Sequence, residues 1–159
     1  VAGTGRGLLY GVFDAIRTEI IEDALVACDK KIIPDNPLRM MNHWDNMDNS
    51  IERGYSGESF FFENNEVVVN ERTREYARLC ASVGINASVI NNVNVKNAAT
   101  YLITERYEKE LKEMAEIFAE YGVDLFLQEK SRFSGFSAKE ELCSNQQRLH
   151  RKEKVSLSG

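Results

Sequence analysis

Two short polar segments hold the side chains best suited to chemistry. The first is Asn42-His43-Trp44-Asp45-Asn46 and the second is Asn91-Asn92-Val93-Asn94. Asn and Asp offer donors and acceptors that can bridge neighbouring hydroxyl groups. An indole ring can cover the C–H face of a sugar while its N–H stays free to bond. These residue types therefore favour carbohydrate binding.

The polar segments follow two apolar runs, residues 38–41 and 85–90, which are predicted strands, and residues 123–127 form a third. Apolar residues at helical spacing precede the second and third runs, which predicts a helix before each. Gly84 and Gly122 are placed to end those helices. The helical positions are Tyr76, Leu79, Cys80 and Val83, then Tyr107, Leu111, Met114, Ala115, Phe118 and Tyr121. This alternation predicts an α/β fold with parallel strands, as either a TIM barrel or a doubly wound sheet.

Because active sites of parallel α/β folds lie at the carboxyl ends of strands, we expect both polar segments at one edge. Structural alternatives stay open for each. Trp44 fits a core aromatic equally well, and His43 is more often a structural histidine than a catalytic one. Residues 91–94 also suit a plain strand-to-helix turn.

The flanking regions differ in character. Residues 7–21 carry apolar residues at helical spacing, which predicts a buried amphipathic helix, and residues 3–7 are predicted to be a glycine-rich turn. Both prolines lie within residues 29–37, which predicts a domain boundary. Residues 42–69 are predicted to be a long functional loop, ordered by three phenylalanines. Residues 131–159 lose their periodicity, which predicts a loose tail.

Composition narrows the function classes. The chain has 159 residues, 43% of them apolar, which predicts a folded protein. Its net charge of -5 favours neither nucleic acid nor anionic lipid, and no apolar run is long enough for a bilayer. Three scattered cysteines and two histidines fit no disulfide framework and no metal cluster, so we expect no cofactor. Cys80 is expected in the core, and the glycosylation pattern at Asn86 is discounted because it opens a predicted buried strand.

Several motifs, in this order, resemble one enzyme family. They are Gly7-Leu8-Leu9-Tyr10-Gly11-Val12-Phe13, the run from Pro37 to Asn46, Ser50-Ile51-Glu52-Arg53-Gly54-Tyr55, Tyr76-Ala77-Arg78, Gly84-Ile85-Asn86 and Ile90-Asn91-Asn92-Val93-Asn94. Together they look like the microbial alpha-glucuronidases of glycoside hydrolase family 67, over residues 5–127. Each motif alone is weak, whereas the series is specific.

The resemblance implies a domain layout. Residues 1–36 would be the end of an N-terminal α/β domain. Residues 37–128 would begin a (β/α)8 TIM barrel with its first three strands, and residues 129–159 would be a divergent tail. A complete barrel typically needs about 250 residues. The missing initiator Met also suggests that the chain starts within a longer protein.

The resemblance also implies an activity. The family removes α-1,2-linked 4-O-methylglucuronic acid from xylo-oligosaccharides with inversion, using a carboxylic acid and a carboxylate base. In the family these come from later strands, so no catalytic residue is assigned here and the isolated chain is expected to be inactive. Substrate binding is expected from Asn42, Trp44, Asp45, Asn91, Asn92 and Val93, with Val93 against the 4-O-methyl group.

Further expectations concern partners and competing functions. The expected partner is a glucuronic-acid-bearing xylo-oligosaccharide, and a homodimer is considered for the full-length enzyme. A cytoplasmic location is expected, with secretion as the alternative. The competing interpretations are a non-catalytic carbohydrate-binding α/β domain and an α/β binding domain with no role in sugar recognition.

Overall fold

A three-stranded parallel sheet organises the molecule. The computed structural model describes residues 2–22, 31–91 and 101–128. The strands are β1 (Met40–Asn42), β4 (Ala87–Val89) and β5 (Asp124–Phe126), in the order β1-β4-β5. Met40 pairs with Ala87, and Ala87 pairs with Asp124. The three predicted strands and their parallel pairing are therefore confirmed, with small shifts at their ends.

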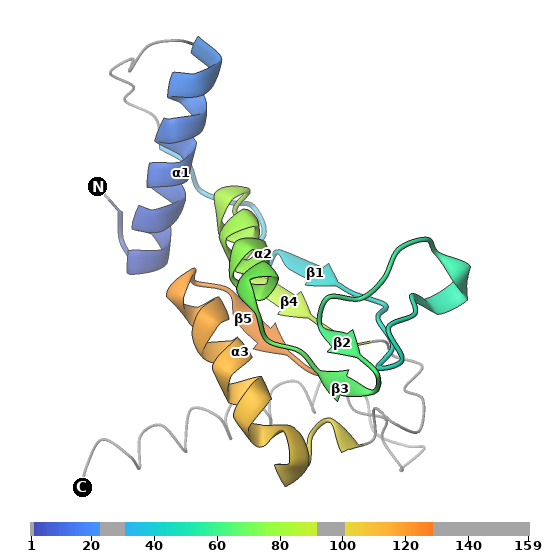
Figure 1. The fold of residues 1–159 in the computed structure, drawn as a ribbon. Helices are drawn as coiled ribbons and strands as arrows, with labels where there is room; N and C mark the ends of the chain where they lie inside the picture. Colours follow the sequence, from blue (N-terminus) through green and yellow to red (C-terminus); the bar gives the residue numbers. More distant parts are fainter. Residues whose placement is uncertain (1, 23–30, 92–100, 129–159) are drawn as a thin grey trace, which may run out of the picture.

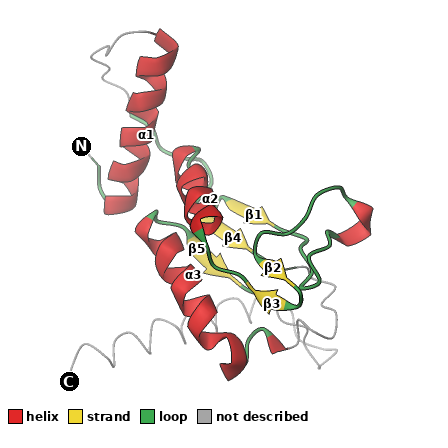
Figure 2. Ribbon diagram, viewed as in Figure 1, coloured by secondary structure: helices red, strands yellow, loops and turns green. Residues whose placement is uncertain are grey.

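Two helices connect these strands and lie on the same face of the sheet (Figure 1). They are α2 (Glu71–Ser82), before β4, and α3 (Glu108–Glu120), before β5; the short 3-10 helix η3 (Glu105–Tyr107) leads into α3. Gly84 and Gly122 follow the two α-helices with φ angles of 79° and 66°, which confirms the predicted stops. Figure 2 shows the same layering, with helices over strands. The parallel α/β architecture is thus confirmed.

The hydrophobic core fills the space between these helices and the sheet. Phe118 of α3 packs against Tyr76 of α2 and Phe61 of the connecting segment. Cys80 is buried in this core, as predicted. The predicted inward face of α2 is wrong in part, because Leu79 and Val83 are 59% and 61% exposed. The buried residues of α2 are Thr73, Ala77, Cys80 and Ala81.

The long predicted loop contains local structure that its composition conceals. It holds a short 3-10 helix, η1 (Glu52–Gly54), and an antiparallel hairpin of β2 (Phe62–Glu63) and β3 (Glu66–Val67). Asn64 and Asn65 form the two-residue hairpin loop with φ angles of 53° and 64°. Positive φ at both positions is the geometry of a type I′ turn, which asparagine tolerates. Phe61 and Phe62 are fully buried, so the predicted order of this region is confirmed.

Helix α1 (Gly5–Glu22) lies beside the edge of the sheet at which the strands begin. The predicted helix is confirmed, but its predicted burial is wrong, because Leu8 and Ile20 are 60% and 76% exposed. The predicted glycine turn also ends early. Gly5 and Gly7 are helical, and the Thr4 hydroxyl accepts a hydrogen bond from the Gly7 amide at 3.0 Å.

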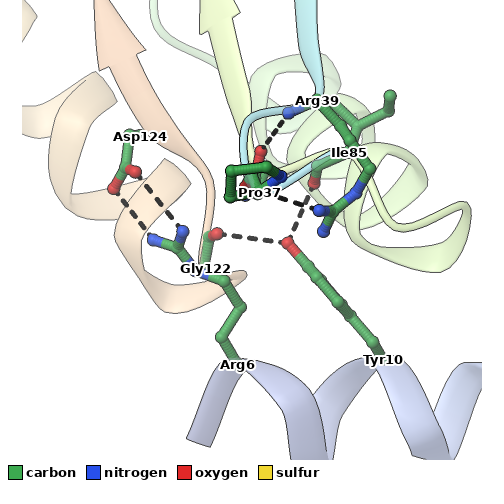
Figure 3. A network of polar contacts seen from close by, with 8 residues as sticks. Arg6, Tyr10, Pro37, Arg39, Ile85, Gly122 and Asp124 are labelled. Atoms are coloured by element: carbon green, nitrogen blue, oxygen red, sulfur yellow. Dashed lines mark hydrogen bonds and ion pairs between the residues drawn. The ribbon is translucent and has the colours of Figure 1, made fainter. Parts of the chain in front are cut away.

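Polar side chains hold the inward side of α1, as Figure 3 shows. The Tyr10 hydroxyl donates to the carbonyl oxygens of Ile85 at 3.0 Å and Gly122 at 3.4 Å. Arg6 forms an ion pair with Asp124 at 2.9 Å. Ile85 and Gly122 occupy equivalent positions, each two residues before a paired position of β4 and β5. Tyr10 therefore bridges the amino ends of two neighbouring strands.

Asn86 makes a similar bridge between β4 and the segment before β1. Its carboxamide accepts from the Arg39 amide at 2.8 Å and donates to the Pro37 carbonyl at 2.7 Å. The residue is 6% exposed, and both the oxygen and the nitrogen of its side chain are bonded to these backbone groups. The structure thus agrees with discounting Asn86 as a glycosylation site.

Candidate functional site

The two polar segments begin at the same edge of the sheet. Asn42 ends β1 and pairs with Val89, the last residue of β4, and the His43 amide donates to the Val89 carbonyl at 2.9 Å. Asn91 follows two residues later. The predicted convergence of the segments is therefore confirmed for their described residues. We call this edge, formed by residues 42–46, Asn91 and Gln128, the carboxyl rim.

The six predicted substrate-binding residues differ in accessibility. Asn42 is exposed and Trp44 is half-buried, whereas Asp45 and Asn91 are buried at 6% and 1%. Asn92 and Val93 lie outside the described residues. Among the described positions, Asn42 and Trp44 are thus the most open to a ligand.

The Trp44 indole contacts Arg53 of η1 and Tyr55, the C-cap residue of η1. The Arg53 guanidinium lies 5.0 Å from the centre of the indole, and the Tyr55 ring meets the indole edge-on at 6.2 Å. Arg53 itself has a φ of 58°, and Gly54 follows at 70°. A left-handed conformation is costly for a residue with a side chain. With this backbone turn, Arg53 lies over the half-buried indole of Trp44, which is not part of the buried core cluster of the described residues.

Asp45 is a buried carboxyl group at the rim. Its backbone forms an isolated antiparallel bridge with Ile51, and its side chain is hydrogen-bonded to Ser59. Burial raises the pKa of Asp45, while the bond from Ser59 and the nearby His43 act in the opposite direction. Ser59 Oγ also accepts from the amides of Phe61 and Phe62, at 3.1 and 3.2 Å. The buried phenylalanine segment therefore helps to fix the place of this carboxylate.

His43 links Asp45 to helix α2 and strand β4. Its Nδ1 is 3.8 Å from Asp45 Oδ1, and its Nε2 is 2.5 Å from the Tyr76 hydroxyl. That hydroxyl also lies 3.3 Å from Ser88 Oγ, which is fully buried in β4. Burial lowers the pKa of His43, against the attraction of Asp45. The ring packs edge-on against Phe61 at 5.0 Å, so the contacts agree with a structural histidine.

Asn91 joins the carboxyl ends of β4 and β5. Its carboxamide nitrogen donates to the Gln128 carbonyl and its oxygen accepts from the Gln128 amide, both at 2.7 Å. The side chain thus replaces a pair of backbone ladder bonds beyond the last residues of the two strands. The side chain is therefore committed to holding the two strand ends together.

The described residues of the carboxyl rim are polar and aromatic. Within residues 2–22, 31–91 and 101–128, no group of three or more His, Cys, Asp and Glu side chains is arranged to hold a metal ion. No helix in these same ranges is long and apolar enough to span a membrane. The exposed Asn42 carboxamide and the half-buried indole of Trp44 are groups that can contact a hydroxyl-rich ring.

Sequence reasoning missed four contributors to this site. Arg53 and Tyr55 belong to a motif that was noted only as a resemblance, and Tyr76 was assigned only to the core face of a helix. Ser59 had no distinguishing signal. The pair Arg53-Gly54 carried the best available clue, because a glycine beside a charged residue within an Asn- and Gly-rich segment indicates an unusual backbone turn.

Comparison with known proteins gives a consistent result. The family model described as "Glycosyl hydrolase family 67 middle domain" matches residues 21–146. The match begins inside α1 and continues past residue 128, into the segment that the resemblance implied to be a divergent tail.

The chain also resembles curated fungal proteins. It is 41% identical over 119 residues to a protein named "Probable alpha-glucuronidase A" from Aspergillus terreus, which covers 74% of this chain and 14% of that protein. It is 40% identical over 126 residues to "Alpha-glucuronidase A" from Aspergillus tubingensis, covering 79% of this chain and 14% of that protein. The chain therefore spans about one seventh of the length of these relatives. Because the family model covers residues 21–146, most of the chain, the chain belongs to glycosyl hydrolase family 67.

Proposed function

We propose that this chain is part of the catalytic unit of an alpha-glucuronidase and forms one side of its sugar-binding site. The observation that carries the proposal is the family match across residues 21–146, combined with the meeting of two motif segments at the carboxyl rim. The relatives' names give the substrate class, since both are called alpha-glucuronidases. The bond cleaved would be the α-1,2 linkage between 4-O-methylglucuronic acid and xylo-oligosaccharide.

The proposed architecture is the first part of a (β/α)8 barrel. Three parallel strands in sequential order, with both connecting helices on one face, are what the opening of such a barrel requires. The same arrangement also occurs in half of a doubly wound sheet. Both β1 and β5 lie at the edges of the described sheet, where the further strands of a barrel would pair. The family supports the barrel as the way in which those edges are paired.

In the proposed site, Trp44 covers a sugar ring and the polar groups of Asn42, Asp45, Asn91 and Asn92 bond its hydroxyls. Trp44 would use the indole face opposite Arg53. Val93 is proposed to contact the 4-O-methyl group, because it is the only apolar residue in residues 91–94. Inverting hydrolysis needs two carboxyl groups about 6.5–9.5 Å apart. We propose that other strands of the barrel supply both groups.

Two measurements test this proposal. Purified chain is incubated with aldouronic acids that carry terminal 4-O-methylglucuronic acid, and release of the acid is compared with a heat-denatured control. The same sugars are then titrated against the chain while the emission of Trp44, its only tryptophan, is followed. Binding without turnover is the expected result, because the acid and base are proposed to lie elsewhere.

A matched pair of variants locates the binding. Trp44→Ala is expected to abolish binding and to be silent in fluorescence, so its binding is followed by calorimetry. Tyr101→Ala, at an exposed aromatic outside the rim, is the control and should bind as the parent chain does. A chain that binds no aldouronic acid in calorimetry would count against a sugar site at this rim.

A further inference from the structure

A continuous series of polar contacts runs inward from the carboxyl rim. It passes from Asp45 to His43 at 3.8 Å, then to Tyr76 at 2.5 Å, and on to Ser88 at 3.3 Å. The His43 ring is 18% exposed and the Asp45 side chain 7% exposed. Each polar group in this series is therefore largely removed from water and depends on its neighbours for hydrogen bonds.

The geometry restricts the protonation of the imidazole. A tyrosine hydroxyl is protonated at neutral pH, and burial raises the pKa of Tyr76 further. When this hydroxyl donates to Nε2 of His43, the ring hydrogen must reside on Nδ1, which is the nitrogen that faces Asp45. A distance of 3.8 Å is too long for a hydrogen bond, but the N–H and the carboxylate attract each other electrostatically.

We propose that His43 is a positioning residue for the carboxyl rim, a neutral ring anchored by Tyr76 that directs its Nδ1–H toward the carboxylate of Asp45. The ring thereby transmits the fixed position of α2 and β4 to the segment that carries Trp44. The effect of His43 on sugar binding rests on the function proposed above, whereas its effect on the position of the rim residues does not.

Protonation of His43 would change this arrangement in a defined way. Nε2 would then donate to the Tyr76 oxygen, and the Tyr76 hydrogen would turn to Ser88 Oγ or to the Cys80 sulfur, with which Tyr76 also interacts. The charged ring would draw the Asp45 carboxylate inward. The nearest basic side chain on the packed elements is Arg72 of α2, which lies over the Phe60 ring that borders His43. The titratable groups that contact the ring are Asp45 and Tyr76.

The sequence offers a direct spectroscopic test, because the chain has two histidines and one tryptophan. His150→Ala leaves His43 as the only imidazole, and its nitrogen resonances are recorded from pH 4.5 to 8 on chain with ¹⁵N-labelled histidine. The expected result is an Nδ1–H neutral ring that titrates below the ordinary histidine pKa of about 6.5. An Nε2–H ring, or titration at or above that value, would overturn the proposal.

Two variants separate the role of the anchor from general stability. Tyr76→Phe removes only the hydroxyl that faces His43, so the ring should lose its single tautomer and give averaged nitrogen shifts. Tyr107→Phe is the matched control, since its hydroxyl donates to the Asn65 carbonyl at 2.8 Å and the nitrogen shifts of His43 should not change. The emission of Trp44 should follow the titration of His43 in the parent chain and in Tyr107→Phe. Unchanged His43 shifts in Tyr76→Phe would contradict the anchor.

A further variant keeps the test decisive if Tyr76→Phe does not fold. Asp45→Asn preserves shape but removes the carboxylate that favours protonation of His43, so the ring should titrate at still lower pH. No movement would contradict the pairing of His43 with Asp45. Sugar binding tests the link to the proposed function in a separate measurement. Tyr76→Phe should weaken sugar binding about fivefold, equivalent to one neutral hydrogen bond. A chain that binds no sugar refutes the function, while the nitrogen spectra still decide the role of His43.

Discussion

Replacing Asn91 with alanine should destabilise the folded chain, because this side chain bonds the backbone of Gln128 twice. Both bonds are 2.7 Å long and the residue is 1% exposed. A net contribution of about 1 kcal/mol for each bond gives a loss of about 2 kcal/mol in the free energy of unfolding. The Gln128 backbone groups are half-buried, so water can partly replace Asn91 and keep the loss near this value.

Asn91→Asp sharpens the same prediction through its pH dependence. An ionised carboxylate can still accept from the Gln128 amide, but it places a second oxygen against the Gln128 carbonyl in place of a donor. The variant should therefore be less stable than the parent chain at pH 7. Part of the difference should be recovered as pH falls through the pKa of the new carboxyl group, because the protonated acid can donate again.

The assay is reversible urea unfolding followed by far-ultraviolet circular dichroism, at the lowest workable protein concentration. Asn42→Ala is the matched control, because Asn42 is an exposed asparagine at the end of the neighbouring strand and should change stability by less than about 0.5 kcal/mol. An Asn91→Ala variant as stable as Asn42→Ala would refute the reasoning. It would mean that Asn91 is free to serve a ligand and that β4 and β5 do not need this bridge.

Four further outcomes are expected. The purified chain should release no glucuronic acid from aldouronic acids, and turnover above a heat-denatured control would contradict this. Tyr10→Phe should lower the free energy of unfolding by about 1 kcal/mol, because Tyr10 bridges two strand ends, whereas Tyr55→Phe should not. The chain should bind the dye ANS or self-associate through the exposed apolar side of α1, and replacing Leu8 and Ile16 with glutamine should reduce both. The contribution of His43 to stability should be lost as pH falls below about 6.5, because burial lowers its folded pKa and the unfolded chain takes up the proton first; His43→Gln should flatten this part of the pH profile.

Local sequence signals predicted the parallel strands well. β4 and β5 are short apolar runs that each follow a glycine in a left-handed conformation, Gly84 and Gly122, whereas β1 follows Pro37. This pattern involves only residues that are close together in the chain, so it can be recognised without knowledge of the fold. The hairpin at Asn64-Asn65 was also encoded locally, but the flanking strands are only two residues long and their alternation is too brief to recognise.

Helix orientation was harder to predict than helix position. The apolar residues of α1 and α2 fit a helical repeat, yet Leu8, Ile20, Leu79 and Val83 are exposed. A repeat identifies a helix, but which side is covered depends on what packs against it. In α1 the polar residues Arg6 and Tyr10 face the sheet edge, which no hydrophobic pattern would indicate.

The sequence by itself determined the family, the order of helices and strands, and the presence of two polar segments after neighbouring strands. Motifs and stop signals are properties of residues close together in the chain, so they can be read without coordinates. Only the tertiary structure decided what each rim residue does. It buried Asp45 beside His43, engaged Asn91 with Gln128 and placed Arg53 over Trp44. These roles depend on contacts between segments distant in sequence and on access to water. The same type of polar side chain stabilises the fold when it is buried and can bind a ligand when it is exposed.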